Sequence, residues 1–155
     1  AKCDLTITTG GVSVGEKDLV PQSLQELGAE IIFHKIDVKP GSPALFAILN
    51  GRPVLSLSGN PFAAAATFEL LARPILSVLC KDNSLNPTGV DAILQTPFEK
   101  SGGRRFLRGF YKNGIVNLPS GHSSGQFHSM LGCNCLAEIK HGPVYPGTKI
   151  KAVIL

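Results

Sequence analysis

The feature that most constrains the fold is an abrupt change of sequence pattern near Asn86-Pro87. Before this point, short apolar runs alternate with stretches in which apolar residues recur at helical spacing. After it, short runs are separated by turn residues and the helical spacing disappears. Strand–helix alternation is typical of a parallel sheet covered by helices, and a series of short strands is typical of a small barrel or sandwich. We therefore predict an α/β domain over residues 1–85 and an all-β barrel or sandwich domain over residues 86–155.

The pattern of the first half predicts three strand–helix units. We expect, in chain order, a buried strand over residues 3–8, a helix that Asp18 caps and that runs through Leu27 to a stop at Gly28, and a strand over 29–36. A short helix over 43–49, a strand over 53–57 and a helix from Pro61 that Pro74 kinks follow. In a parallel sheet, right-handed crossovers bring the loops after the strands to one edge, where open α/β sheets bind ligands. Loops 9–15 and 58–61 both follow strands, so we expect both at that edge.

The second half carries a clear hairpin signal. Asn113-Gly114 suits a type I′ turn, so residues 104–111 and 115–118 are predicted to pair. Further strands are expected over residues 135–140 and 149–155, with a turn at Pro146-Gly147 between them.

Composition supports a globular chain with an aliphatic core. Of 155 residues, 43% are hydrophobic and 17% charged, and tryptophan is absent. The longest apolar run, residues 61–80, is interrupted by Glu69, Arg73 and Pro74, so we expect no membrane span. The four cysteines lack the spacing of a zinc site, which favours reduced thiols in a cytoplasmic protein. Because Ala1 leads almost directly into a strand, we expect a fragment of a longer protein.

Charge is distributed unevenly along the chain. Residues 1–86 carry 7 Lys and Arg against 8 Asp and Glu, whereas residues 87–155 carry 8 against 3. Such asymmetry suggests an anionic partner for the second half, either nucleic acid or a small phosphorylated ligand. On a strand, Arg104 and Arg108 share one face and Arg105 lies on the other, which favours closure over a small anion rather than a nucleic-acid groove.

The glycine-rich segment 9–18 is the most informative part of the chain. Glycines after a strand let main-chain amides approach an anion, but the spacing matches neither a Walker A loop nor a dinucleotide fingerprint. Spacing alone supports an anion loop and a simple tight turn about equally. Asp18 and Glu16 could hold Mg²⁺ beside a phosphate, although a carboxylate at a helix start is more often a cap.

Three other groups of residues are weaker candidates. Lys35 and Lys39 suit an oxyanion such as phosphate or molybdate, or are ordinary solvated lysines. Loop 58–61, Ser-Gly-Asn-Pro, could face a ligand or simply open a helix. His122 and His128 match no common metal motif and are expected to be loop residues.

Three segments together resemble the molybdopterin molybdenumtransferases, the family of MoeA and the gephyrin E domain. They are Thr-Thr-Gly-Gly-Val-Ser-Val-Gly-Glu-Lys-Asp at 8–18, Lys-Ile-Asp-Val-Lys-Pro-Gly-Ser-Pro at 35–43 and Leu-Ser-Gly-Asn-Pro-Phe-Ala-Ala at 57–64. They occur in family order and at family spacing. The resemblance implies part of a parallel-sheet molybdopterin-binding domain followed by a small all-β domain. This fragment alone would be inactive, because family chains have two N-terminal domains and further sheet strands before it.

The resemblance also implies an activity and its partners. Family enzymes insert molybdate into adenylylated molybdopterin and release AMP, with Mg²⁺ or a similar divalent ion. A cytoplasmic homodimer is implied, and the molybdopterin adenylyltransferase is a further candidate partner. Neither a membrane nor nucleic acid is expected to bind.

The family's functional positions carry over residue by residue. Asp18 resembles the family's active-site acidic residue, which lies near the metal and the phosphates. Lys35 and Lys39 resemble the family's basic pair, which lies near the anionic substrate or molybdate. The remaining positions are expected to bind substrate: Gly10, Gly11, Ser13, Gly15, Gly41, Ser58, Gly59, Asn60, Pro61 and Arg108.

The chain departs from the family pattern at several positions. Ser58 replaces a usual proline, Ser42 a usual lysine, and Phe62-Ala63 a usual Val-Ser, while Gly125 stands where many members have serine. These changes favour an alternative, a non-catalytic anion-binding or protein-interaction module derived from the same fold. A nucleic-acid-binding β domain is a third hypothesis, but it leaves the α/β motifs unexplained.

Overall fold

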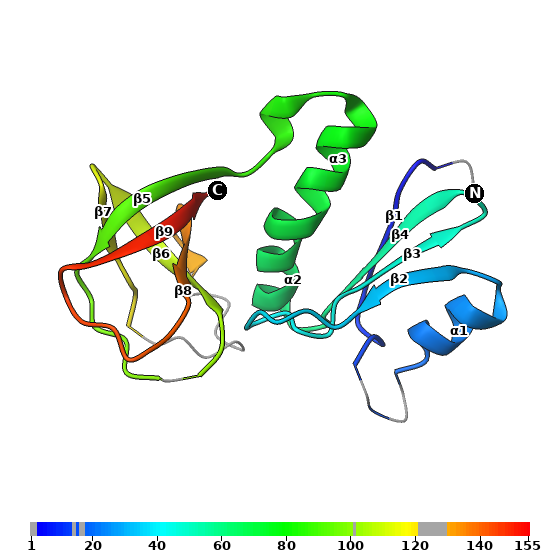
Figure 1. Ribbon diagram of the computed structural model, residues 1–155, viewed down its shortest axis with the longest axis horizontal. Helices are drawn as coiled ribbons and strands as arrows, with labels where there is room; N and C mark the ends of the chain where they lie inside the picture. The colour runs from blue at the N-terminus through cyan, green and yellow to red at the C-terminus, as the bar shows by residue number, and fades with distance from the viewer. Residues whose placement is uncertain (1–2, 14, 16–17, 101, 121–129) are drawn as a thin grey trace.

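The chain folds into a four-stranded sheet and a closed five-stranded barrel joined by a long helix (Figure 1). This computed structural model describes residues 3–13, 15, 18–100, 102–120 and 130–155. The predicted fold class, an α/β part followed by a small β-barrel, is confirmed.

The sheet is mixed and has the strand order β1-β4-β3-β2. Only β1 and β4 run parallel to each other, whereas β3 is antiparallel to both β2 and β4. The elements of this part are β1 (Thr6–Thr9), α1 (Val20–Glu26), β2 (Glu30–His34), β3 (Leu45–Leu49) and β4 (Arg52–Leu57). Strand β1 lies at an edge and is largely exposed, so the expectation of a buried first strand was wrong.

The short helix predicted over residues 43–49 was also wrong, because residues 45–49 form β3. Asn50 and Gly51 adopt φ values of 51° and 75°, the two positive values that a type I′ hairpin turn requires. Leu45 and Ala47 are fully buried between β2 and β4. A short apolar run fits a strand or a buried helix equally well, and the Asn-Gly pair at its end is the local signal that decides for a strand.

Helix α1 starts one residue after Leu19, and no side chain caps it. Asp18, the expected cap, instead accepts a hydrogen bond of 2.7 Å from the main-chain N–H of Gly15. The predicted stop is confirmed, since Gly28 follows the last turn with a φ of 78°.

The long helix lies between the sheet and the barrel (Figure 1) and runs through α2 (Pro61–Thr67), η1 (Phe68–Ala72) and α3 (Arg73–Cys80). The segment η1 is a π-helix in which the Arg73 N–H donates to the Phe68 carbonyl five residues earlier. Proline lacks an N–H and its ring crowds the preceding turn, so a wider turn just before Pro74 accommodates it. The 20-residue helix is long and apolar enough to cross a membrane, but core helices of globular proteins share these properties.

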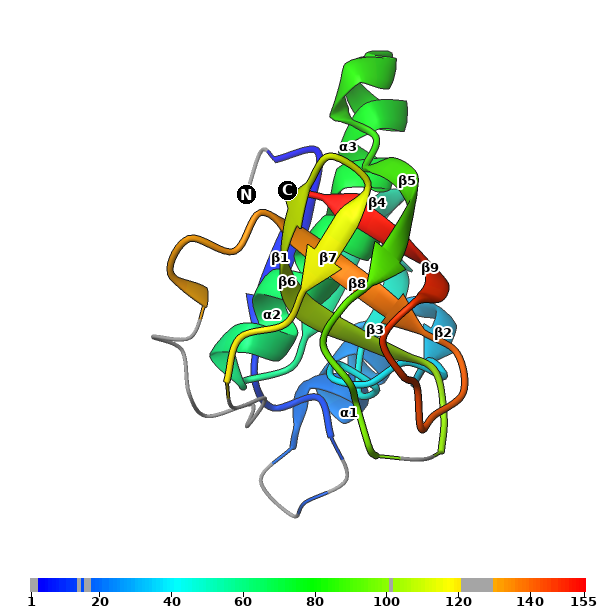
Figure 2. The same cartoon turned by 90° about the vertical axis from the view of Figure 1, so that its left-hand side faces the viewer.

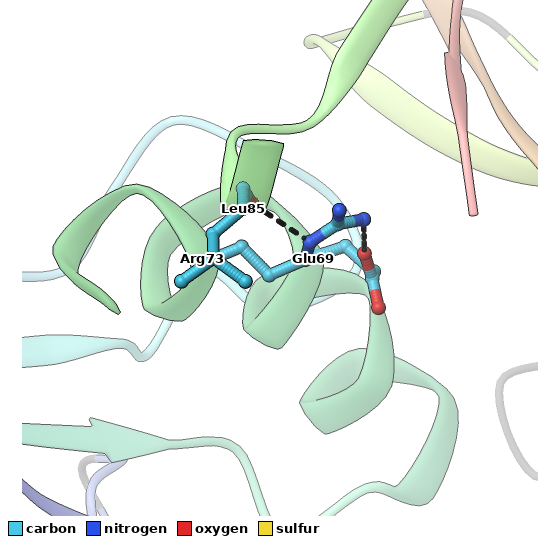
Figure 3. A network of polar contacts seen from close by, with 3 residues as sticks. All are labelled: Glu69, Arg73 and Leu85. Carbon is cyan, nitrogen blue, oxygen red and sulfur yellow. Dashed lines mark hydrogen bonds and ion pairs between the residues drawn. The ribbon is translucent and has the colours of Figure 1, made fainter. Parts of the chain in front are cut away.

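Arg73 ties the end of this helix to the segment that enters the barrel (Figure 3). Its Nε donates to the Leu85 carbonyl at 3.0 Å, and its Nη1 forms an ion pair of 2.8 Å with Glu69. Leu85 ends the short 3₁₀ turn η2 (Asn83–Leu85), which immediately precedes the first barrel strand. Together with Asn86, whose Nδ2 donates to the Ser77 hydroxyl at 2.9 Å, Arg73 therefore fixes the direction in which the chain leaves the helix.

The barrel has the strand order β5-β7-β6-β8-β9 and closes through pairing of β5 with β9 (Figure 2). Its strands are β5 (Thr88–Leu94), β6 (Arg105–Lys112), β7 (Ile115–Asn117), β8 (Cys135–Ile139) and β9 (Thr148–Ile154). The predicted hairpin at Asn113-Gly114 is confirmed, with φ values of 49° and 81°. Strand β5 was not predicted. The interior is mainly aliphatic, as expected from a chain that lacks tryptophan.

The barrel packs directly on the long helix. Phe62 and Ala66 of α2 form one buried cluster with Val38, Phe106 and Leu136. The guanidinium of Arg108 lies 4.2 Å from the centre of the Phe62 ring, and Arg108 is fully buried. A cation over an aromatic face is attracted by the ring quadrupole, most strongly when water is excluded.

We predict that this pair contributes measurably to stability. Phe62→Leu keeps an apolar side chain but removes the aromatic face, and Arg108→Met keeps much of the stem but removes the charge. In a double-mutant cycle followed by urea unfolding, we expect a coupling energy of about 0.5–2 kcal/mol. A coupling near zero would show that Arg108 is held by its other contacts alone.

All four cysteines are free, as the spacing predicted. Cys135 lies in the barrel core, where burial and the neighbouring Cys133 raise its pKa to about 11. Burial also raises the pKa of Cys133, and the positive charge of Arg108 partly offsets this rise. Neither thiol is therefore activated as a nucleophile at neutral pH.

The raised pKa of Cys135 predicts a pH dependence of stability. A cysteine in the unfolded chain ionises near pH 8.5, so from about pH 9 to 11 the unfolded state releases a proton that the folded state keeps. We expect the free energy of unfolding to fall over this range, and to fall less steeply in Cys135→Ala. Equal slopes for the two proteins in urea titrations would contradict the assignment.

Candidate functional site

The two glycine loops meet at one edge of the sheet, as the sequence predicted. Because β1 and β4 are parallel neighbours with Thr9 opposite Leu57, the loops that follow them leave the sheet side by side. The Gly10 N–H donates to the Leu57 carbonyl at 2.9 Å. A Cβ atom on Gly59 would lie only 3.2 Å from the Gly10 Cα, so the main chains approach as closely as glycine allows.

The first loop is fixed by main-chain contacts. The carbonyl of Gly11 accepts from the Val20 N–H at 3.0 Å, and buried Val12 anchors the loop in the sheet core. His34 Nε2 lies 2.8 Å from the Val12 carbonyl, which makes His34 a supporting residue that the sequence analysis did not identify. Nothing in the local sequence around His34 signals this contact, because the two residues lie 22 positions apart.

The carboxylate of Asp18 lies at the end of this loop. Its Oδ2 accepts from Gly15, so the side chain is oriented by the loop that it closes. Ser13 and Gly15 are exposed, and Asp18 is half-buried. Glu16, the other candidate carboxylate, lies outside the described residues.

The second loop starts the long helix. Asn60 Oδ1 accepts from the Ala63 N–H at 3.1 Å, which caps the helix, and Pro61 occupies the first turn. Ser58 Oγ accepts from the Asn60 N–H at 3.3 Å. The amino end of a 20-residue helix therefore faces the edge where the glycine loops meet. Partial positive charge at such an end favours an anion.

The segment that carries Lys35 and Lys39 is a closed loop. The Ile36 N–H donates to the Ser42 carbonyl, and the Ser42 hydroxyl donates back to the Ile36 carbonyl, both at 2.9 Å. Lys35 adopts a φ of 75°, which is unusual for a residue with a side chain. Both lysine side chains are exposed.

This lysine loop also contacts the helix and the barrel. The Lys39 N–H donates to the Arg104 carbonyl and the Phe106 N–H donates to the Lys39 carbonyl, both at 2.9 Å. Gly41 is buried with a φ of 101°, and a Cβ atom there would overlap Cγ2 of Thr67 on α2. Lys39 is thus positioned by main-chain bonds to the barrel while its ammonium group stays in solvent.

Arg108 is not part of an open surface. Its side chain is covered by Phe62, and burial lowers the pKa of the guanidinium from its ordinary value. It lies where the barrel contacts Phe62, the second residue of α2, next to the loop from Ser58 to Pro61.

No group of three or more potential metal ligands occurs among the residues that the structure describes. Asp18 can contribute one carboxylate, whose Oδ2 already holds the Gly15 amide. One protein carboxylate together with substrate phosphates is a usual coordination for Mg²⁺, so the residues present fit an ion that the substrate mainly binds. His122, Gly125 and His128 lie outside the described residues.

The packing of Gly41 makes a prediction about stability. Gly41→Ala combines a positive φ with the overlap on Thr67, so we expect the free energy of unfolding to fall by about 2–4 kcal/mol. Thr67→Ser removes the overlapping methyl group but keeps the hydroxyl that donates to the Ala63 carbonyl. The double variant Gly41→Ala, Thr67→Ser should therefore regain part of the lost free energy of unfolding. Urea unfolding measures both effects.

Gly28→Ala is the matched control, because Gly28 has a φ of 78° but open space around it. It should cost only about 1 kcal/mol. If Gly41→Ala costs no more than this control, the proposed overlap is absent.

Comparison with known proteins gives a consistent set of similarities. Residues 1–78 match a family model described as "Probable molybdopterin binding domain". A protein of Staphylococcus aureus (strain COL) named molybdopterin molybdenumtransferase is 34% identical over 146 residues, which cover 91% of this chain and 35% of that protein. A protein of the same name from Staphylococcus epidermidis (strain ATCC 12228 / FDA PCI 1200) is 34% identical over 144 residues, covering 90% and 34%.

Solved structures match over nearly the whole chain. A molybdopterin biosynthesis MoeA protein from Pyrococcus horikosii has a TM-score of 0.79 and 24% identity, covering 99% of this chain and 37% of that one. A molybdenum cofactor biosynthesis protein from Pyrococcus furiosus has a TM-score of 0.73 and 22% identity, covering 99% and 50%. At these identities the likeness shows a shared fold. The chain spans about a third of the length of the curated relatives that it matches.

Proposed function

Because the chain belongs to the molybdopterin-binding family of the molybdopterin molybdenumtransferases, we propose that it supplies part of the active site of such an enzyme. The complete protein would insert molybdate into adenylylated molybdopterin and release AMP. The observation that carries this proposal is the close approach of Gly10 and Gly59, which brings two main-chain loops and a helix amino end to one sheet edge. A pterin phosphate is an anion of the kind that such an arrangement binds.

Each candidate residue has a role that its surroundings support. The first loop would bind the pterin phosphate through the main-chain amides of Gly10, Gly11 and Gly15 and the hydroxyl of Ser13. The loop from Ser58 to Pro61 would face it. Lys35 and Lys39 keep their ammonium groups exposed, so they are available to attract molybdate or the substrate's phosphates. Gly41 holds the lysine loop against α2.

Arg108 would act by position. Its burial under Phe62 fixes the barrel on the helix whose amino end forms part of the site. The exposed Lys39 is bonded to the same barrel strand through its main chain, so a shift of the barrel would move Lys39.

The chemistry that we propose for these residues is mainly electrostatic and positional. Asp18 would hold Mg²⁺ together with substrate phosphates, and the ion would neutralise phosphate charge. The bond from Gly15 to Asp18 fixes the carboxylate, so little reorganisation is needed when substrate arrives. The lysines and main-chain amides would orient the anionic substrates toward each other.

The remaining expectations belong to the complete protein. We propose that it forms a homodimer in the cytoplasm, that the molybdopterin adenylyltransferase is a candidate partner, and that the domain boundary lies at residues 85 and 86. The fragment by itself would be inactive, since relatives are about three times longer.

A second candidate function is a non-catalytic module that kept the fold. It is favoured by Ser42 and Ser58, whose hydroxyl groups are engaged in closing their own loops. Such a module would bind an anion or a protein at the same edge without transferring molybdenum.

The test is molybdenum insertion by the complete protein with adenylylated molybdopterin, molybdate and Mg²⁺. Asp18→Asn keeps the acceptor for Gly15 but removes the charge, so we expect a loss of activity of at least about a hundredfold. Asp4→Asn, an exposed carboxylate before β1, serves as the matched control and should leave the rate unchanged.

Three results would separate the hypotheses. A folded but inactive wild-type protein would reject the enzyme and favour the non-catalytic module. An active wild type with an unaffected Asp18→Asn variant would keep the activity but reduce Asp18 to a loop-closing residue. Loss of activity confined to Asp18→Asn supports the proposed role.

A further inference from the structure

The barrel half of the chain has more basic residues than acidic residues to pair with them. Residues 87–155 contain eight lysines and arginines. Of the arginines, Arg104 forms an ion pair of 2.7 Å with Glu138, and Arg108 is buried against Phe62. The cations predicted to close over an anion are therefore largely engaged within the fold. The other six cations of this half are Arg105 and five lysines.

Three of these lysines line a single hollow where β8 connects to β9. Lys140, Lys149 and Lys151 surround it together with His141 and Asp91, and its volume is about 420 Å³. Val144, which is half-buried, supplies apolar surface to the lining, and the buried Ile139 and Ile150 lie beneath it. Pockets for small organic ligands typically span about 300–1,000 Å³ and combine an apolar floor with a few polar groups. The hollow has the size and composition of such a pocket.

The strand register shows which of these cations are neutralised. On β9, Lys151 pairs with Asp91 on one side and with Glu138 on the other, and its ammonium lies 3.8 Å from the Asp91 carboxylate. Lys149 is opposite Ile93 on β5, and continuing the β8–β9 register places Lys140 level with Lys149. Over the described part of the chain, neither Lys140 nor Lys149 forms an ion pair.

We propose that this hollow is a second anion site that binds a small organic phosphate. The phosphate would lie between Lys140 and Lys149, and the apolar part of the ligand would lie against the half-buried Val144. Lysine ammonium groups bind phosphate as point charges and tolerate varied geometry. A small ligand fits better than a polynucleotide, because Lys140 and Lys149 flank one hollow, whereas Arg104 is paired with Glu138 and Arg108 is buried against Phe62.

This site is separate from the sheet-edge site and does not depend on the proposed transferase activity. It lies on β5, β8, β9 and their connection, whereas the glycine loops follow β1 and β4. Asp18→Asn is therefore expected to leave it intact.

The experiment is a titration of the whole 155-residue chain with phenyl phosphate and, separately, with inorganic phosphate, followed by amide chemical shifts in NMR. We expect phenyl phosphate to saturate with a Kd near or below about 1 mM and to bind more tightly than inorganic phosphate. The shifts should centre on residues 139–151. Lys140→Gln and Lys149→Gln should each weaken binding about fivefold, and the double variant more than tenfold.

The control variant is Lys112→Gln, an exposed lysine at the end of β6 that does not line the hollow. It should bind phenyl phosphate like the wild type. Loss of binding in Lys112→Gln equal to that in Lys149→Gln would overturn the site, because it would show a general charge effect. Shifts spread over the whole chain, or no saturation by about 10 mM, would also overturn it.

A third arm tests the other source of phosphate. A 20-nucleotide single strand that binds when phenyl phosphate does not would overturn the small-ligand site in favour of nucleic acid. Competition of phenyl phosphate with the strand at Lys140 and Lys149 supports the proposal.

Discussion

The structure depends on one helix that packs against the barrel on one side and the sheet on the other. Near its start, Phe62 and Ala66 pack on barrel residues Phe106 and Leu136. Further along, Ala72 packs with Leu55 and Leu57 of the sheet. Small side chains let both β structures approach the helix axis, so the helix sets how the sheet and the barrel lie relative to each other (Figure 1). A substitution that tilted this helix would displace both at once.

The candidate site follows from that arrangement. The amino end of the helix comes directly after β4, so it lies at the same sheet edge as the loop after β1. Gly41 then fits the lysine loop against the helix, and main-chain bonds from Lys39 join that loop to the barrel. Parts from three regions of the sequence therefore meet around one helix end. Lys35 and Lys39 of this loop remain exposed, and lysine ammonium groups recognise anions without strict geometry.

Arg104 and Arg108, just before and within β6, show how packing engages charged side chains inside the fold. In the sequence they are the densest group of cations, and Arg108 was a candidate substrate ligand. In the structure Arg104 pairs with Glu138 and Arg108 is covered by Phe62, so both stabilise contacts within the fold. Lys140 and Lys149, for which no ion pair is found among the described residues, line the hollow between β8 and β9. Charge counted along a sequence therefore identified the barrel as the cation-rich half, but it did not distinguish the arginines engaged in packing from the lysines around the hollow.

Local chemistry in the sequence determined the change from α/β to all-β, the hairpin at Asn113-Gly114, the helix start at Asn60-Pro61 and the meeting of the two glycine loops. These features rest on turn residues, caps and strand order, which act within a few residues or follow from general topology. Only the tertiary structure decided that residues 45–49 form a strand, that β1 is an exposed edge and that Arg108 is buried. A short apolar run can form a strand or a helix, and an arginine side chain can lie in solvent or against an aromatic ring. Which of these occurs depends on partners that lie tens of residues away, because burial is a property of the packed chain rather than of any segment.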